Sequence, residues 1–148
     1  MPRIAARPNW DQYFNSFAVA ASKRGTCDRK HVGAVIVVDK QVVSTGYNGS
    51  VAGLPHCDDV GHDMVEGHCV RTIHAEMNAL AQAARRGTRV QGSTIYTTAS
   101  PCWDCFRVMA NAGIERFIYQ EPYRSDDNAE RIMAVAATLG LEVKQLGR

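Results

Sequence analysis

Apolar positions in the first third of the chain predict a helix followed by a buried hairpin. Apolar residues recur at helical spacing behind Asn9 and Asp11, either of which can cap a helix that we expect to run to about Arg24. Residues 32–38 form the continuous apolar run VGAVIVV, which is typical of a strand buried on both faces. Residues 41–47 follow a tight connection and are predicted to be its antiparallel partner.

The second half of the chain alternates helical and strand patterns. Residues 73–86 consist largely of strong helix formers, and Gly87 suits the C-terminal cap of that helix. Ser100 is the expected N-cap of a further helix, with Pro101 in its first turn. Residues 48–72 show neither the helical nor the strand period of apolar residues. A loop of this length inside a compact domain usually has a function or is held in place by other contacts. The predicted helices of this half are 73–86, 100–112 and 126–139, and its predicted strands are 93–98, 116–119 and 141–145.

The order of these elements predicts an α/β fold. One helix and a hairpin are followed by three helix–strand units, which implies a mixed five-stranded sheet with helices on both faces. The hairpin should supply the antiparallel pair, and the later crossovers should be parallel and right-handed. A length of 148 residues predicts a single domain that covers residues 1–148.

Composition and charge narrow the classes of function. The net charge is +2 and no Lys/Arg run exceeds two adjacent residues, whereas polynucleotide-binding surfaces usually carry a denser basic stripe. No apolar run approaches the roughly 20 residues that cross a membrane, and the N-terminal residues lack the apolar core of a secretory signal. We therefore expect a soluble cytoplasmic protein with no membrane or polynucleotide partner. Its 5 cysteines cannot all pair, which directs attention to metal binding or thiolate chemistry.

Two short motifs have the residue types and spacing of a metal site. The first is HAE, which contains His74 and Glu76, and the second is PCWDC, which contains Cys102 and Cys105. Cysteines three apart on one helical turn can face a single ion, and a helix N-terminus favours their thiolate form. With His74 as a third ligand, the fourth tetrahedral position stays open for water, as in catalytic zinc sites.

Glu76 is expected beside that water without binding the metal. Zinc lowers the pKa of bound water toward about 7, and Glu76 can carry the water's proton to a ring nitrogen and then to a leaving amine. A CxxC motif alone is equally compatible with a redox-active or buried pair, and HxE alone indicates little. Together, H-x-E and P-C-x-x-C are the signature of zinc-dependent deaminases.

HAEMNAL at 74–80 and SPCWDC at 100–105 resemble the cytidine deaminase-like superfamily. Further segments are similar to deoxycytidylate (dCMP) deaminases, especially the phage and bacterial branch that includes late-competence-operon homologues. The resemblance implies a three-layer α-β-α fold and zinc-dependent hydrolysis of dCMP to dUMP and ammonia, as part of pyrimidine nucleotide metabolism. The segments that carry it are 32–37, GYNG at 46–49, GLPHC at 53–57, HCVRTIHAE at 68–76 and Pro122-Tyr123.

The resemblance also implies roles for single residues. His74, Cys102 and Cys105 would hold the catalytic zinc, and Glu76 would shuttle the proton. The implied substrate contacts are Asn48 at the sugar and base edge, the main chain of Ala75 and Ser100 at the pyrimidine, Tyr123 beside the base, and Arg29, Lys30 and Arg124 as candidate cations for the 5′-phosphate.

A second set of Cys and His residues surrounds the patternless segment 48–72. A structural zinc with four ligands would tie this segment to the end of the first helix. By resemblance, some phage and bacterial dCMP deaminases have such a site. The alternative is that the histidines lie on the surface and the first cysteine is a small buried apolar residue. The expected ligands are Cys27, Cys57, His62 and His68, with Cys69 as a substitute.

The resemblance further implies a homohexamer that dCTP with Mg²⁺ activates and dTTP inhibits, with the effector bound near residues 46–53. Two other interpretations stay open. One is a deaminase of another nucleobase or of a modified cytosine nucleotide. The other is an inactive, zinc-stabilised binding module, against which Glu76 argues because a structural zinc has no use for that carboxylate.

Overall fold

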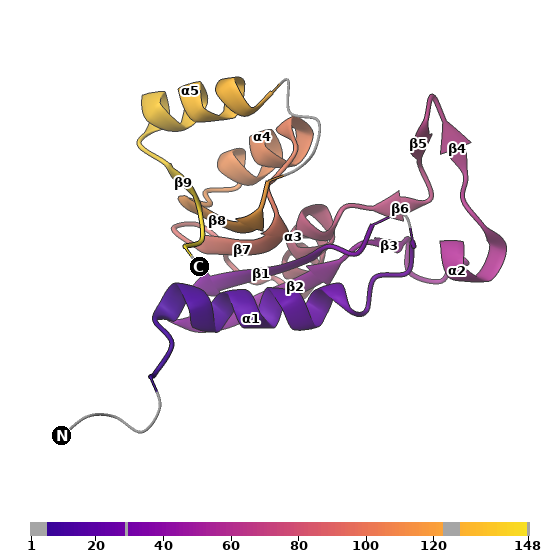
Figure 1. Cartoon of the computed structure of the whole chain (residues 1–148), viewed down its shortest axis with the longest axis horizontal. Coiled ribbons are helices and arrows are strands. Elements are labelled where there is room, and N and C mark those ends of the chain that lie inside the picture. Colours follow the sequence, from indigo (N-terminus) through magenta and orange to yellow (C-terminus); the bar gives the residue numbers. More distant parts are fainter. Residues whose placement is uncertain (1–5, 29, 123–127, 148) are drawn as a thin grey trace.

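A mixed five-stranded sheet forms the centre of the computed structural model, which describes residues 6–28, 30–122 and 128–147. The strands lie in the order β2-β1-β7-β8-β9 (Figure 1). Strand β1 is antiparallel to both of its neighbours, whereas β7, β8 and β9 are parallel to one another. The bounds are β1 Gly33–Val38, β2 Gln41–Tyr47, β7 Thr94–Ala99, β8 Arg116–Glu121 and β9 Glu142–Gln145.

Helices cover both faces of this sheet. On one face lies α1, Trp10–Ser22, which Asn9 caps and which ends two residues before the predicted Arg24. Its Phe14 packs in a cluster with side chains of β1, β7 and β8. The predicted three-layer α-β-α architecture is therefore confirmed, although residues 126 and 127, predicted to begin the last helix, lie outside the described residues. The other face carries α3 Ala75–Arg86, α4 Trp103–Asn111 and α5 Ala129–Leu139.

The strand directions differ from the prediction in one pairing. We expected antiparallel pairing only in the hairpin, but β1 also pairs antiparallel with β7, with Ala34 opposite Thr97. Helix α3 carries the chain past β1, so β2 and β7 run in the same direction without being neighbours. The β7–β8 and β8–β9 pairs are parallel, as predicted.

Two helix starts lie later in the chain than the sequence predicted, and both shifts concern candidate metal ligands. Helix α3 begins at Ala75 with His74 as its N-cap. Helix α4 begins at Trp103 with Cys102 as its N-cap, so the prediction of Ser100 as the cap is wrong. The physical reason is that the sulfur of Cys102 accepts an amide N–H of the first turn and replaces the expected hydroxyl.

The segment 48–72 contains short elements where we predicted none. Together they project from the body of the sheet on the side where α3 begins (Figure 1). One small hairpin, one helical turn and a short two-stranded sheet that closes the base give the segment its shape, but it has few buried residues of its own. The elements are β3 Gly49–Ser50 paired with β6 Thr72–Ile73, α2 Cys57–Val60, and β4 Met64–Val65 paired with β5 His68–Cys69.

A glycine in β2 allows α3 to approach the sheet closely. A Cβ at Gly46 would overlap the carbonyl oxygen of Ala75 and lie 2.5 Å from the amide nitrogen of Ala79. The hydroxyl of Ser44 donates a hydrogen bond of 2.6 Å to the carbonyl of Ala79. The first turn of α3 is therefore held directly against β2.

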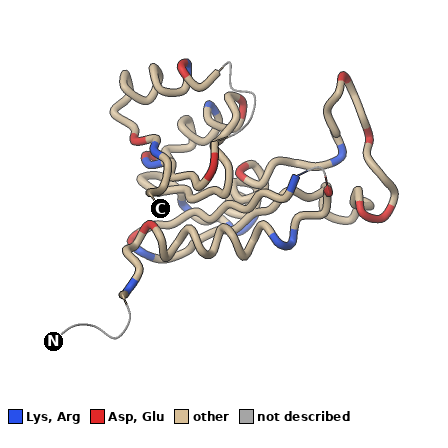
Figure 2. Tube along the Cα trace, viewed as in Figure 1, with Lys and Arg blue, Asp and Glu red and all other residues tan. Residues whose placement is uncertain are grey.

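Charged side chains are distributed over several elements. Figure 2 shows Lys and Arg positions interspersed with Asp and Glu along the chain. Within the described residues, no helix has both the length and the apolar character needed to cross a membrane.

Candidate active site

Two helix starts bring three predicted ligands together. His74 caps α3, and Cys102 and Cys105 lie at the start of α4. The Nδ1 atom of His74 lies 3.5 Å from the sulfur of Cys102 and 3.3 Å from that of Cys105. A tetrahedral zinc with bonds of about 2.0–2.3 Å separates its nitrogen and sulfur ligands by roughly 3.5 Å. The donor set and its spacing therefore fit one zinc ion with a fourth position left for water.

The protonation of these groups favours metal binding. Hydrogen bonds from Cys105 and from His74 lower the pKa of Cys102 to about 4. The hydrogen bond to Cys102 also raises the pKa of His74, and the hydrogen bond between the thiol of Cys105 and the sulfur of Cys102 raises the pKa of Cys105. Cys102 therefore loses its proton readily, and the resulting thiolate is the form that binds a metal.

Glu76 lies next to this cluster and outside the group of ligand atoms. It is the second residue of α3 and is only 4% exposed. Burial raises the pKa of its carboxyl group, and the side chain hydrogen-bonds the thiol of Cys105. A buried carboxyl with a raised pKa beside a metal site is suited to accept and release protons.

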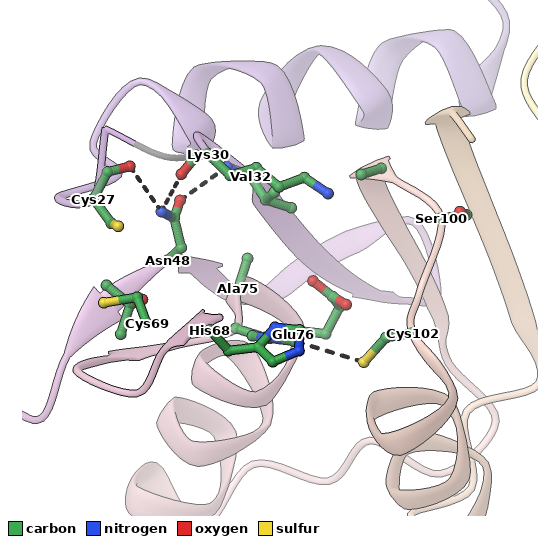
Figure 3. A pocket seen from close by; sticks show the side chains of 13 residues that line it. Cys27, Lys30, Val32, Asn48, His68, Cys69, Ala75, Glu76, Ser100 and Cys102 are labelled. Carbon is green, nitrogen blue, oxygen red and sulfur yellow. Dashed lines mark hydrogen bonds between the residues drawn. The ribbon is translucent and has the colours of Figure 1, made fainter. Parts of the chain in front are cut away.

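A pocket of about 210 Å³ opens beside the cluster. Three of the predicted substrate contacts, Asn48, Ala75 and Ser100, line it together with Glu76, and so does the candidate cation Lys30. Figure 3 shows Cys27 and Cys69 on one side of this pocket and Cys102 on the other. The remaining predicted contacts, Arg29, Tyr123 and Arg124, lie outside the described residues.

The side chain of Asn48 holds the segment between α1 and β1. Its Oδ1 accepts the amide N–H of Val32 at 2.9 Å, and its Nδ2 donates to the carbonyl oxygens of Cys27 (3.4 Å) and Lys30. Asn48 is buried, and these bonds engage both ends of its amide. In this arrangement Asn48 positions Lys30 and Val32 at the pocket wall.

A second group of possible ligands forms where the segment 48–72 meets the end of α1. The sulfur of Cys27 lies 3.4 Å from Nδ1 of His62, and the sulfurs of Cys57 and Cys69 are 3.5 Å apart. All four ligand atoms lie within 4.8 Å of one another. Although burial opposes it, hydrogen bonds from the backbone of residues 63 and 71 lower the pKa of Cys69 to about 6.

This group corrects one predicted ligand. The structure places Cys69, and not His68, with the other three residues. Both belong to β5, where adjacent side chains point to opposite faces, so only one of them can face the group. His68 instead lines the pocket beside Glu76. Asp28, whose carboxylate lies 2.8 Å from Nε2 of His62, was not predicted, because nothing in the local pattern marks it.

Comparisons with known proteins agree with this geometry. A family model described as the cytidine and deoxycytidylate deaminase zinc-binding region matches residues 8–121. ComE operon protein 2 of Bacillus subtilis is 42% identical over 140 residues, which cover 95% of this chain and 72% of that protein. The deoxycytidylate deaminase of Mycobacterium phage D29 is 40% identical over 126 residues, which cover 77% of this chain and 96% of that protein.

A solved structure has the same fold. The dCMP deaminase of cyanophage S-TIM5, in complex with dCMP and dUMP, matches with a TM-score of 0.79 and 27% identity, over 96% of this chain and 100% of that one. The family model, these relatives and the cluster of His74, Cys102 and Cys105 beside Glu76 lead to one conclusion. The chain belongs to the cytidine and deoxycytidylate deaminase family, whose shared region binds zinc.

Proposed function

We propose that this protein is a hydrolase that converts dCMP to dUMP and ammonia. The observation that carries the proposal is the buried carboxyl of Glu76 beside the cluster of His74, Cys102 and Cys105, in a pocket that is open to a small molecule. Relatives that match most of the chain are deoxycytidylate deaminases, and the cyanophage enzyme was solved with both dCMP and dUMP.

The side chains of the site divide the reaction between them. When bound, zinc lowers the pKa of a water molecule toward about 7. Glu76 accepts a proton from the attacking water as its oxygen bonds to C4 of cytosine, and delivers that proton to ring nitrogen N3. Glu76 then passes the second proton to the amino group, the C4–N bond breaks, and ammonia leaves as the carbonyl of uracil forms. Water supplies the oxygen and both protons, so no other co-reactant is needed.

The pocket wall offers contacts for the rest of the nucleotide. The main chain of Ala75 and Ser100 borders the space beside Glu76, where the pyrimidine would lie. Asn48 and Lys30 border the part toward β1. For the residues outside the described ranges, we propose that Tyr123 packs near the base and that Arg29 and Arg124 contribute to phosphate binding. We propose one domain, residues 1–148, that acts in the cytoplasm, where thiols stay reduced.

We also propose that Cys27, Cys57, His62 and Cys69 hold a second, structural zinc. Four ligands close the coordination sphere, which is typical of structural sites. The carboxylate of Asp28 accepts a hydrogen bond from the far ring nitrogen of His62, and metal-binding histidines usually have such a partner. The ion would link α2 and β5 to the end of α1 and order a segment with little core of its own.

A nucleotide effector site is proposed at a second pocket, beside α3. Its lining includes residues 46, 47 and 49–52. Arg85 and Arg86, from the last turn of α3, also line it. Guanidinium groups bind phosphates through paired hydrogen bonds, so the pocket suits dCTP with Mg²⁺ as activator and dTTP as inhibitor. For the proposed homohexamer, Val108 of α4 and Met133 of α5 supply exposed apolar surface.

Replacing the proton carrier should abolish turnover and leave the metal in place. We expect Glu76→Gln to lower the rate of ammonia release from dCMP by at least about a hundredfold while its zinc content stays at the wild-type value. The exposed Glu115→Gln is the matched control and should behave as wild type. A panel of dCMP, dCTP, deoxycytidine and 5-substituted dCMP separates the alternative substrates. If zinc-loaded wild-type protein deaminates none of them, the enzyme proposal is wrong and the binding-module interpretation takes its place.

Metal analysis should find close to two zinc ions per chain. We expect Cys57→Ser and Cys69→Ser each to lose one ion, because each removes one of four ligands. His68→Ala should keep both ions, since His68 lies outside the group. Loss of an ion from His68→Ala, together with its retention in Cys69→Ser, would show that the earlier ligand prediction was right.

Effector binding should depend on the arginines of α3. At subsaturating dCMP, dCTP with Mg²⁺ should raise the rate of the wild-type protein and dTTP should lower it. The double variant Arg85→Ala and Arg86→Ala should lose both responses, whereas Arg89→Ala, which does not line the pocket, should keep them. Sedimentation velocity on the same samples should show a hexamer. Responses that persist in the double variant would place the effector elsewhere.

A further inference from the structure

Two thiols of the proposed structural metal group lie close enough to react with each other. The sulfurs of Cys57 and Cys69 are 3.5 Å apart, and both cysteines are free. A disulfide bond holds two sulfurs at about 2.05 Å, so a movement of about 1.5 Å would join this pair. Cys57 begins α2 and Cys69 ends β5, and both elements belong to the segment 48–72, which has few buried residues. The pair can therefore close without a rearrangement of the main sheet.

The two thiols differ in their access to small molecules. Cys69 is partly exposed and lines the pocket of about 210 Å³ that contains Glu76. Cys57 is only 6% exposed and is not among the described residues that line this pocket. Figure 3 shows Cys69 at the pocket wall. A small oxidant in the pocket thus reaches Cys69 first, and Cys57 is the buried neighbour that can react with the oxidised sulfur.

A disulfide between these residues is incompatible with the proposed structural ion. Metals bind the thiolate form of cysteine, which a disulfide removes. The other two members of the group, Cys27 and His62, lie 3.4 Å apart and would be the only ligands left. Structural zinc sites require four protein ligands, so two do not retain the ion. The group therefore holds either a metal or a disulfide.

We propose that Cys57 and Cys69 form a reversible disulfide when a peroxide oxidises Cys69, and that this disulfide replaces the structural ion. The sulfur of Cys69 attacks one peroxide oxygen, the O–O bond breaks, and a sulfenic acid and water form from hydrogen peroxide. The thiol of Cys57 then attacks that sulfur, the S–O bond breaks, and a second water leaves.

The atoms and electrons of this sequence balance. Two thiols and one hydrogen peroxide give one disulfide and two waters, and the two sulfurs supply the two electrons that reduce the O–O bond. A dithiol reductant reverses the change by thiol–disulfide exchange. The inference rests on the proposed structural zinc for the ion that is released, and it does not depend on deamination.

The exchange also changes the pocket wall. Cys27 and Cys69 both line the pocket, and an ion bound by the whole group ties them to each other. The disulfide ties Cys69 to Cys57 instead and leaves Cys27 without that link. We therefore expect the oxidised protein to bind a nucleotide more weakly, so that the modification lowers activity under oxidising conditions.

The catalytic cluster contains a similar pair of thiols in a firmer setting. Cys102 caps α4, and Cys105 lies in the first turn of that helix, is 1% exposed and belongs to the main hydrophobic core. The segment 48–72 lacks such a core, and segments with few buried contacts open at a lower cost in free energy. We therefore expect Cys57 and Cys69 to be oxidised before the catalytic pair.

Tryptic mapping of the zinc-loaded protein after treatment with hydrogen peroxide tests the modification. Cleavage after Lys and Arg places Cys27 in peptide 25–29, Cys57 and Cys69 together in 41–71, and Cys102 and Cys105 together in 90–107. We expect peptide 41–71 to lose the mass of two hydrogen atoms while the other two peptides keep free thiols. A chromogenic chelator should record release of one ion at the same rate. A dithiol and added zinc should restore both thiols and the ion.

Cys57→His separates the disulfide from the loss of a ligand. Histidine can act as the fourth ligand but cannot form a disulfide, and two cysteines with two histidines are a common zinc set. This variant should keep two ions and release one to the peroxide at least about tenfold more slowly than wild type. If histidine does not fit at this buried position, Cys57→Ser gives a second measurement. In that variant the sulfenic acid of Cys69 should accumulate and react with dimedone, whereas Cys69→Ser is the control that should not react.

The effect on the pocket is measured by calorimetric titration with dUMP. The oxidised wild-type protein should bind dUMP at least about fivefold more weakly than the reduced protein, and a dithiol with zinc should restore the affinity. Oxidised Cys57→His should bind dUMP as its reduced form does.

Four results would overturn the inference. They are release of the ion while peptide 41–71 keeps both thiols, a cross-link that contains Cys27, oxidation of peptide 90–107 before 41–71, and a disulfide in a protein that holds a single zinc throughout. A protein that exchanges the ion for the disulfide but neither binds dUMP nor deaminates dCMP would uphold the modification site and refute the proposed activity.

Discussion

The direction of three strands determines where the chemistry of this protein takes place. Because β1 is antiparallel to both β2 and β7, the starting end of β1 and the finishing ends of β2 and β7 lie at one edge of the sheet. Helix α4 follows β7, and α3 packs its first turn against Gly46 near the end of β2, so both helices begin at this edge. The cluster of His74, Cys102 and Cys105 results from that convergence.

The same constraint explains the remainder of the pocket. Lys30 and Val32 precede β1 and therefore reach this edge from the opposite direction, where Asn48 holds them. Glu76 lies one residue inside α3, and its buried side chain is next to the cluster of candidate ligands. Burial keeps water other than the reactant away from the carboxyl and raises its pKa, which suits a group that must both take and give a proton. Fold and mechanism are thus consequences of one arrangement of helix starts.

Local pattern predicted much of the fold and the residues of the catalytic cluster. The apolar run 32–38 and the motifs around His74 and Cys102 carry their own periodicity and chemistry, so they could be assigned without tertiary contacts. The antiparallel pairing of β1 with β7 could not, because strand order depends on how α3 crosses the sheet. The helix start at Trp103 was missed because a cysteine sulfur replaces the usual hydroxyl cap.

The difference between the expected ligand His68 and the residue found in the group, Cys69, has a different cause. Two adjacent ligand-type residues in a strand of two residues differ only in the face toward which they point, and that face depends on the hairpin register. Asp28 was missed for a similar reason, since its partner His62 is distant in sequence. In both cases the information lies in how the segment 48–72 folds back onto the end of α1.

If this edge of the sheet performs hydrolytic deamination of dCMP, water must supply the oxygen at C4 of the product. The most direct test is mass spectrometry of the product after incubation of zinc-loaded protein with dCMP in ¹⁸O-labelled water. We expect dUMP that carries one ¹⁸O atom at C4, with one ammonia released for each dUMP formed. Recovery of unchanged dCMP, or of dUMP without the label, would contradict it.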